Sequence, residues 1–195
     1  MNSRPLILAS TSPYRRQLLE RLKLPFSVAS PKIDETPLPG ETPHMLVLRL
    51  SESKARAVAS NQQQGLIIGS DQAAVLNGEI LGKPGNRPNA IAQLQKCSGN
   101  SVIFHTGLCL LDVGNGKTQL DDVLYEVKFR ALTSGQIERY VDSELPFDCA
   151  GSFKAESLGI CLFEYMRGED PSSLIGLPLI RLTTMLHNAG IRLPL

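Results

Sequence analysis

The sequence has no long hydrophobic run and no excess of charge of either sign. The apolar stretch nearest the N-terminus, residues 6–9 (LILA), is too short to form the core of a signal peptide. No stretch approaches the roughly 20 apolar residues that a membrane-spanning helix requires. The sequence therefore predicts a cytoplasmic protein with no membrane partner.

Charged residues are almost balanced, with 20 lysines and arginines against 19 aspartates and glutamates. A formal net charge of +1 gives no general attraction to a polyanion or to an anionic membrane surface. Nucleic acid is therefore not an expected partner. Any charge that matters for function must be gathered locally by the fold.

Several patterns typical of particular site chemistries are missing. There is no GxxxxGKS phosphate loop, no GxGxxG after a strand and no HExxH metal motif. The cysteines form no CxxC pair, which argues against a zinc site and favours buried thiols over disulfides. The histidines are far apart along the chain, which gives little support to a histidine-based catalytic triad. These residues are Cys97, Cys109, Cys149 and Cys161, and His44, His105 and His187.

The apolar pattern alternates between strands and helices over a chain of 195 residues, which is long enough to bury a substantial core. No Pro/Gly/Ser-rich linker divides the chain, so a single domain over residues 1–195 is expected. Asn77-Gly78 between two apolar pairs predicts a β-hairpin. We predict further strands at residues 6–9, 66–68, 102–111 and 123–129, and helices that begin near Pro13, Pro43, Pro88, Thr133 and Pro178.

Residues 10–16 (STSPYRR) follow the first strand directly and open a helix. A helix that starts there points free backbone N–H groups, and the positive end of its dipole, at one spot. Arg15 and Arg16 add guanidinium groups suited to phosphate oxygens. On this segment alone, a phosphate site and an ordinary Ser-Pro helix cap carry similar weight.

Two acidic segments are candidates for holding a cation. Asp71 follows the strand at residues 66–68, and ligands commonly bind at the carboxyl ends of strands. Glu35 lies in an acidic pair before a proline and could supply a second ligand. Each has a common structural alternative, a turn aspartate in the first case and a solvated acidic pair in the second. Other segments also allow both a functional and a structural interpretation when each is taken singly. They are Lys54, Lys83 and the small-residue loop 149–156.

Taken in order, these segments resemble the signature of the Maf family of nucleotide pyrophosphatases. The resemblance extends over nearly the whole chain and depends on ordered blocks rather than on any single motif. It implies an α/β fold of the Maf and inosine-triphosphatase type, with a mixed twisted sheet, flanking helices and two lobes around a central cleft. The blocks are residues 10–16, 34–36, 53–55, 69–72, 82–84, 150–154 and 176–178.

The resemblance also implies an activity and a set of site residues. The expected reaction is hydrolysis of a nucleoside triphosphate between the α and β phosphates, which releases pyrophosphate and uses Mg²⁺, Mn²⁺ or Co²⁺. Asp71 matches the family's catalytic carboxylate, and Glu35 joins it as a candidate metal ligand. The sequence leaves the oligomeric state open, and a homodimer is among the expected forms. The matching phosphate-binding residues are Ser10, Arg15, Lys54 and Lys83.

Three positions divide the family by the base of the substrate. Tyr14, Gln72 and Glu156 resemble the branch of 7-methyl-GTP pyrophosphatases, whereas the UTP and dTTP branch tends to have arginine, threonine and glutamine. An aromatic face can stack on the positively charged methylated base. A glutamate can accept hydrogen bonds from the guanine N1–H and amino group. Tyr14 stands where that branch usually has tryptophan, which is the stronger cation–π partner.

The resemblance therefore implies a 7-methyl-GTP pyrophosphatase. One alternative is a UTP or dTTP pyrophosphatase of the same family, and another is a non-catalytic nucleotide-binding regulator of cell division. Asp71 and Glu35 favour an enzyme, because a pure binder has less need of carboxylates that face phosphates.

Overall fold

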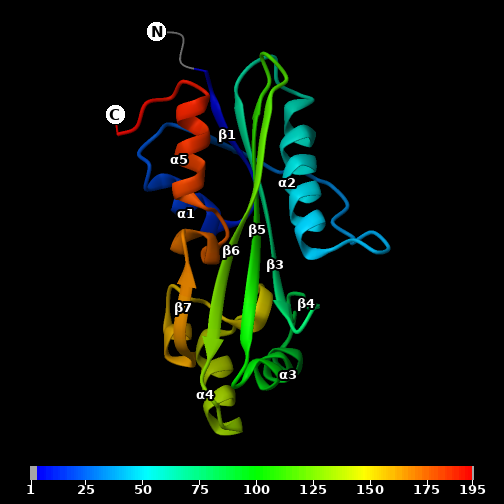
Figure 1. The fold of residues 1–195 in the computed structure, drawn as a ribbon, viewed down its shortest axis with the longest axis vertical. Helices are drawn as coiled ribbons and strands as arrows, with labels where there is room; N and C mark the ends of the chain where they lie inside the picture. Colours follow the sequence, from blue (N-terminus) through cyan, green and yellow to red (C-terminus); the bar gives the residue numbers. More distant parts are fainter. Residues whose placement is uncertain (1–3, 195) are drawn as a thin grey trace.

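A mixed, twisted β-sheet runs the length of the molecule (Figure 1). The computed structural model describes residues 4–194, so residues 1–3 and 195 of the predicted domain lie outside the described part. The strands are β1 (Leu6–Ala9), β2 (Ser27–Ala29), β3 (Leu66–Leu76), β4 (Glu79–Leu81), β5 (Ser101–Asp112), β6 (Thr118–Phe129) and β7 (Phe163–Gly168). Their order is β2-β1-β3-β5-β6-β7, with β4 paired to β3. β1 pairs in parallel with β2 and β3, and the remaining pairs are antiparallel, which confirms the predicted mixed sheet.

Helices flank both faces of this sheet. The α-helices are α1 (Pro13–Glu20), α2 (Pro43–Ala59), α3 (Arg87–Cys97), α4 (Ser134–Glu144) and α5 (Leu179–Asn188), and the 3₁₀ turns are η1 (Ala150–Ser152), η2 (Leu158–Leu162) and η3 (Pro171–Ile175). At one end of the molecule α1 and α5 lie on one side of the sheet and α2 on the other, while α3, α4 and β7 surround the opposite end (Figure 1). None of the helices within residues 4–194 has the length and apolarity that crossing a bilayer requires.

The predicted helix starts are confirmed at their caps. The Ser12 hydroxyl accepts a hydrogen bond from the Arg15 amide at the start of α1, and Thr42 caps α2 in the same way. Thr133 and Gln136 form the predicted capping box of α4. The predicted hairpin is also present, with Asn77 and Gly78 both at positive φ between β3 and β4.

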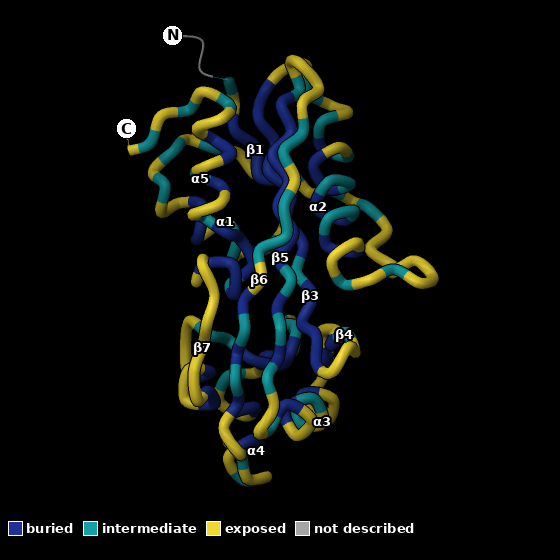
Figure 2. The backbone as a smooth tube through the Cα atoms, in the orientation of Figure 1, coloured by how far each residue is buried: buried dark blue, intermediate teal, exposed yellow. Residues whose placement is uncertain are grey.

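The core is divided by the sheet into separate clusters. On β1, Leu6 and Leu8 pack towards α1 and α5, whereas Ile7 and Ala9 pack towards α2, so this strand is covered on both faces as predicted. A third cluster fills the other end of the molecule and includes Phe104, among aromatic and aliphatic side chains of α3 and α4. Figure 2 shows β1 and β3 buried along nearly all of their length.

β3 is much longer than predicted, which changes the position of Asp71. The strand continues to Leu76, so Asp71 lies in its middle rather than after its end. β1 ends at Ala9, opposite Gly69, and the next residues of β3 have a strand partner only on the β5 side. Asp71 therefore lies beyond the carboxyl end of β1. The space next to Asp71 is open because the neighbouring strand β1 ends before it.

The prediction of buried thiols is partly wrong. Cys97 and Cys109 are buried, but Cys149 is half-buried and Cys161 is exposed, and all four thiols are free. Cys161 is exposed because η2 turns only part of its surface, including Leu162, towards the core. The short strand β2 and the edge strand β7 were not predicted, since most of their residues are exposed and show no hydrophobic alternation.

Helix α2 lies unusually close to the sheet because two strand residues have no side chain. A Cβ atom at Gly69 would collide with the backbone oxygen of Ser51, and one at Gly107 would collide with that of Val47. Both obstacles are helix backbone, which no rotamer change can move. The glycines therefore set the distance between α2 and strands β3 and β5.

We expect Gly107→Ala to lower the free energy of unfolding by about 1–3 kcal/mol, because the added methyl group forces α2 away from the sheet. Urea denaturation monitored by circular dichroism measures the change. Gly82→Ala is the matched control, since nothing lies within 4 Å of a Cβ atom at Gly82. Equal stabilities of the two variants would contradict the proposed close contact.

Candidate active site

A cavity of about 520 Å³ opens where β1 ends and β3 continues. Its walls come from the β1–α1 junction, the loop before α2, α2 itself, β3, the segment after β4, the loop 148–156 and η3. The fold thus brings together all the residues predicted for the site. They are Ser10, Tyr14, Arg15, Glu35, Lys54, Asp71, Gln72, Lys83 and Glu156.

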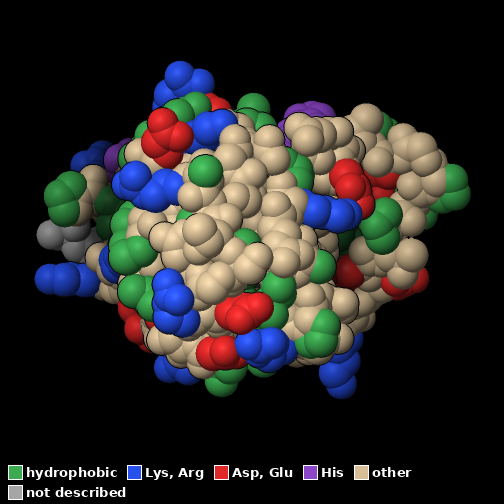
Figure 3. Space-filling model, turned by 90° about the horizontal axis from the view of Figure 1, so that it is seen from below, with side chains coloured by type: hydrophobic (Ala, Val, Ile, Leu, Met, Phe, Trp, Pro, Cys, Tyr) green, Lys and Arg blue, Asp and Glu red, His purple; other side chains and the backbone are tan. Residues whose placement is uncertain are grey.

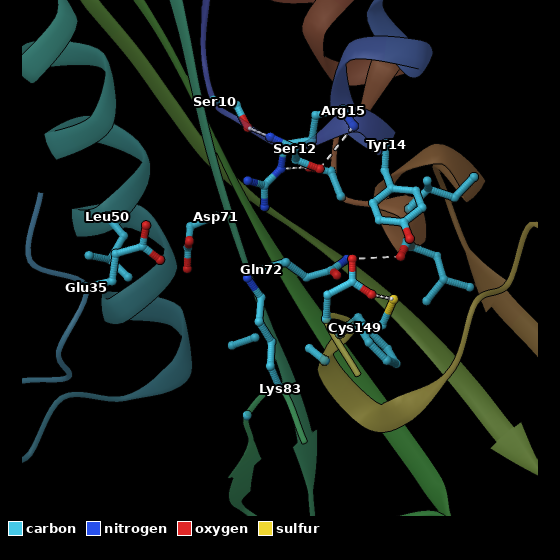
Figure 4. A pocket seen from close by; sticks show the side chains of 18 of the residues that line it. Ser10, Ser12, Tyr14, Arg15, Glu35, Leu50, Asp71, Gln72, Lys83 and Cys149 are labelled. Carbon is cyan, nitrogen blue, oxygen red and sulfur yellow. Dashed lines mark hydrogen bonds between the residues drawn. The ribbon is translucent and has the colours of Figure 1, made fainter. Parts of the chain in front are cut away.

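The junction between β1 and α1 forms one wall of the cavity (Figure 4). Ser10 is buried, and its hydroxyl accepts a hydrogen bond from the Ser12 amide. Ser12 in turn caps α1 at Arg15. The Arg15 Nε atom donates to the Gly176 carbonyl at 2.8 Å, which holds the guanidinium group on the cavity side of the helix.

Lys54 joins the two acidic candidates. Its Nζ atom lies 2.6 Å from Asp71 Oδ1 and 3.0 Å from Glu35 Oε1. The Lys54 side chain is only 6% exposed and that of Asp71 11%, whereas that of Glu35 is 55% exposed. Removing one member of a buried ion pair leaves an uncompensated charge, so Lys54 and Asp71 depend on each other.

The two carboxylates fit a divalent cation that is shared with phosphate oxygens. Asp71 and Glu35 already converge on a single positive charge, the Lys54 ammonium group. Residues 4–194 contain no cluster of three or more His, Cys, Asp or Glu side chains able to enclose a metal ion. Mg²⁺ is typically held by one or two carboxylates together with substrate phosphates, and this donor set matches that pattern.

Positive charge surrounds the carboxylates. Burial lowers the pKa of Arg15 from its ordinary value, while the charges of Asp71 and Glu35 oppose that shift. The guanidinium group nevertheless stays protonated, because arginine does not lose its proton in proteins. Lys83 is exposed and reaches the cavity from the segment after β4 (Figure 4). Arg15, Lys54 and Lys83 therefore make a local cationic site in a chain of nearly balanced charge.

The other end of the cavity contains Tyr14 and the loop 148–156. Burial, followed by the nearby Cys149, Asp148 and Glu156, raises the pKa of Tyr14 to about 12. Tyr14 is therefore a neutral phenol at physiological pH. Its ring comes from α1, whereas Glu156 comes from a loop more than a hundred residues later, and only the fold places them near one another.

Sequence reasoning missed the segment that links these two ends. The Gln72 Nε2 atom donates to the Ser173 carbonyl at 2.8 Å and to the Leu174 carbonyl at 3.1 Å, both in η3. Asp170 caps η3 through hydrogen bonds from the Ser172 amide and hydroxyl. The Asp-Pro-Ser sequence is a recognisable cap and Pro-start signal that could have located this turn.

Two of the histidines do meet, but away from the cavity. His44 Nδ1 and His105 Nδ1 lie 2.9 and 2.7 Å from the same Asp122 Oδ2 atom. The cavity lining includes no histidine. The two histidines that meet therefore lie outside the cavity that contains the predicted site residues.

We expect Cys149 to be chemically unreactive although it lines the cavity. Burial and then Asp148 raise the pKa of its thiol to about 12, so that only about 10⁻⁴ of it is thiolate at pH 8. Alkylation with iodoacetamide at pH 8, followed by mass spectrometry, should modify the exposed Cys161 well before Cys149. In denaturant the two thiols should react at similar rates. Early modification of Cys149 in the folded protein would contradict this assignment.

Comparison with known proteins agrees with the motif order. A family model described as "Maf-like protein" matches residues 5–189. A protein of Vibrio vulnificus named 7-methyl-GTP pyrophosphatase is 56% identical over 98% of both chains. One of the same name from Pseudomonas aeruginosa is 56% identical over 97% of this chain and 98% of that one.

The fold has a known counterpart as well. The structure of a HAM1 protein from Coxiella burnetii matches 94% of this chain and 98% of that chain, with a TM-score of 0.53 and 16% sequence identity. At this low identity the likeness concerns the fold alone. Because the family model spans nearly the whole chain and relatives share more than half of its residues, the chain belongs to the Maf family.

Proposed function

We propose that this protein hydrolyses 7-methyl-GTP to 7-methyl-GMP and pyrophosphate with the help of a divalent cation. The observation that carries the proposal is that one cavity is lined by a group of charged side chains and, separately, by Tyr14 and the loop 148–156. Arg15, Lys54 and Asp71 belong to the charged group, and Glu156 belongs to the loop near Tyr14. The names of the relatives from Vibrio vulnificus and Pseudomonas aeruginosa support the same activity.

The charged end suits a triphosphate. Phosphoryl transfer depends mainly on positioning and on stabilisation of negative charge. Arg15, Lys54 and Lys83 supply positive charge, and the start of α1 near Ser10 supplies backbone N–H groups. A divalent cation, when bound, neutralises phosphate charge and polarises a phosphoryl oxygen.

Asp71 is the proposed catalytic residue. In phosphoryl transfer the protein contributes mainly positioning and charge stabilisation rather than a strong base. We therefore assign Asp71 to orienting the attacking water and to holding the cation together with Glu35. Lys54 holds Asp71 in place, since its ammonium group is 2.6 Å from the carboxylate.

The base-binding end suits a methylated guanine. The Tyr14 ring can stack on the positively charged base, a contact worth roughly 0.5–2 kcal/mol. Glu156 is exposed in the cavity wall, where its carboxylate can accept hydrogen bonds from the guanine N1–H and amino group. Uracil has a single ring N–H between two carbonyl groups and cannot match this pattern in the same register.

Pyrophosphate release from 7-methyl-GTP, GTP, UTP and dTTP, at equal concentration with Mg²⁺, tests the substrate. We expect the highest kcat/KM for 7-methyl-GTP and loss of activity when EDTA is added. Preference for UTP or dTTP would agree with the proposed reaction but would contradict the assignment of Tyr14 and Glu156 to recognition of a methylated guanine. A folded protein that binds these nucleotides but releases no pyrophosphate would instead be a nucleotide-binding regulator.

Asp71→Asn should lower kcat by about 100-fold or more, since it removes the water-orienting charge. Asp142→Asn is the matched control, because Asp142 is an exposed carboxylate on α4 that pairs with Arg87 away from the cavity. Thermal unfolding of both variants checks that they are folded. An Asp71→Asn protein with most of its activity would exclude Asp71 from catalysis.

A further inference from the structure

We propose that η3 and Thr106 form an amide clamp that fixes the orientation of Gln72, so that Gln72 presents only a hydrogen-bond acceptor to the base. The inference deepens the proposed function and rests on it, because it assigns the chemistry by which the base is selected. The clamp consists of the Ser173 and Leu174 carbonyls and the Thr106 hydroxyl. It predicts selection for a base edge with adjacent N–H donors, as guanine has.

The orientation of the Gln72 amide follows from the nature of its partners. The Ser173 and Leu174 carbonyl oxygens lie 2.8 and 3.1 Å from the amide group. A carbonyl oxygen only accepts hydrogen bonds, so the group that faces it must be the NH₂ and not the oxygen. Turning the amide by half a rotation would place its oxygen against two carbonyl oxygens, which is repulsive.

Thr106 completes the clamp from the neighbouring strand β5. Its hydroxyl is fully buried and donates to the Ser173 carbonyl at 3.0 Å. Having used its only proton there, Thr106 Oγ1 accepts from Gln72 Nε2 at 3.2 Å. Both amide protons of Gln72 are thus directed at the clamp, and none is left for a ligand.

The turn that carries the two carbonyls is itself held in place. Asp170 is 2% exposed, and its carboxylate accepts hydrogen bonds from Ser172 in η3 and from the Ile180 amide at the start of α5. At the end of the turn Gly176 has a φ of 111°, which a side chain would strain. Its carbonyl accepts from Arg15 Nε, so the same turn that orients Gln72 also positions a phosphate-binding residue.

The atom left for the substrate is Gln72 Oε1. Gln72 lines the cavity, and within residues 4–194 its hydrogen bonds all go through Nε2 (Figure 4). With Glu156, the cavity therefore offers two acceptors from two elements. Guanine presents N1–H and an amino group side by side, whereas uracil flanks its single N–H with carbonyl oxygens that would face an acceptor.

The test uses substitutions at Thr106 and Gln72, with the ratio of kcat/KM for 7-methyl-GTP over UTP as the first readout. Thr106→Val removes the hydroxyl and should lower this ratio by about three- to tenfold, whereas Thr106→Ser keeps the hydroxyl and should retain it. Gln72→Met, which has no acceptor, should lower the ratio by about tenfold or more. Thr133→Ala, which weakens the remote cap of α4, controls for a general loss of stability.

The second readout observes the clamp without catalysis. Hydrogen exchange of the Gln72 side-chain NH₂, followed by ¹⁵N NMR, should be slow in the wild type and in Thr106→Ser, and fast in Thr106→Val. Fast exchange in the wild type would overturn the clamp. An unchanged kcat/KM ratio in Thr106→Val would also overturn the clamp. A fall of this ratio in Thr133→Ala as large as that in Thr106→Val would overturn it as well. If the wild type released no pyrophosphate but the NH₂ were protected, the proposed function would fail while the clamp would stand.

Discussion

The close contact between α2 and the sheet is the constraint on which the site depends. Gly69 and Gly107 lack side chains where the helix backbone passes, and this allows α2 to lie directly against β3 and β5. Lys54, on the same helix, then reaches Asp71 on β3 with an Nζ–Oδ1 distance of 2.6 Å. A larger residue at either glycine would move the ammonium group away from the carboxylate that it neutralises.

The local concentration of charge explains how a nearly neutral protein can hold a highly charged ligand. The surface in Figure 3 mixes positive and negative side chains. Inside the cavity, by contrast, Arg15, Lys54 and Lys83 gather around Asp71 and Glu35. Arg15 and Lys54 are partly removed from water and therefore act on phosphate more strongly than the same charges on an open surface. The net charge of +1 therefore says little about the potential inside the site.

One short turn contacts residues from both ends of the cavity. Carbonyl groups of η3 and of Gly176 accept from Gln72, on the central strand β3, and from Arg15, on the first helix. The Ser173 carbonyl also accepts from the Gly176 amide within the turn, so the side chains add to the backbone hydrogen bonding there. In this arrangement the two ends of the cavity share a single support, which makes the positions of their polar groups interdependent.

Local signals in the sequence determined most of the secondary structure. Ser12, Thr42 and Thr133 identified helix starts because capping involves only neighbouring residues, and Asn77-Gly78 identified a hairpin for the same reason. The ordered motifs also identified the family and the residues that line the cavity.

Tertiary structure decided how those residues meet. The end of β1 at Ala9, rather than the end of β3, creates the opening beside Asp71. Lys54 faces two carboxylates, and Gln72 turns its amide protons towards η3, through contacts between residues distant in sequence. Strand pairing and packing set these distances, and neither is encoded in any short segment. The sequence by itself therefore determined which groups take part, and only the tertiary structure decided which atom each group presents, because that depends on partners brought together by folding.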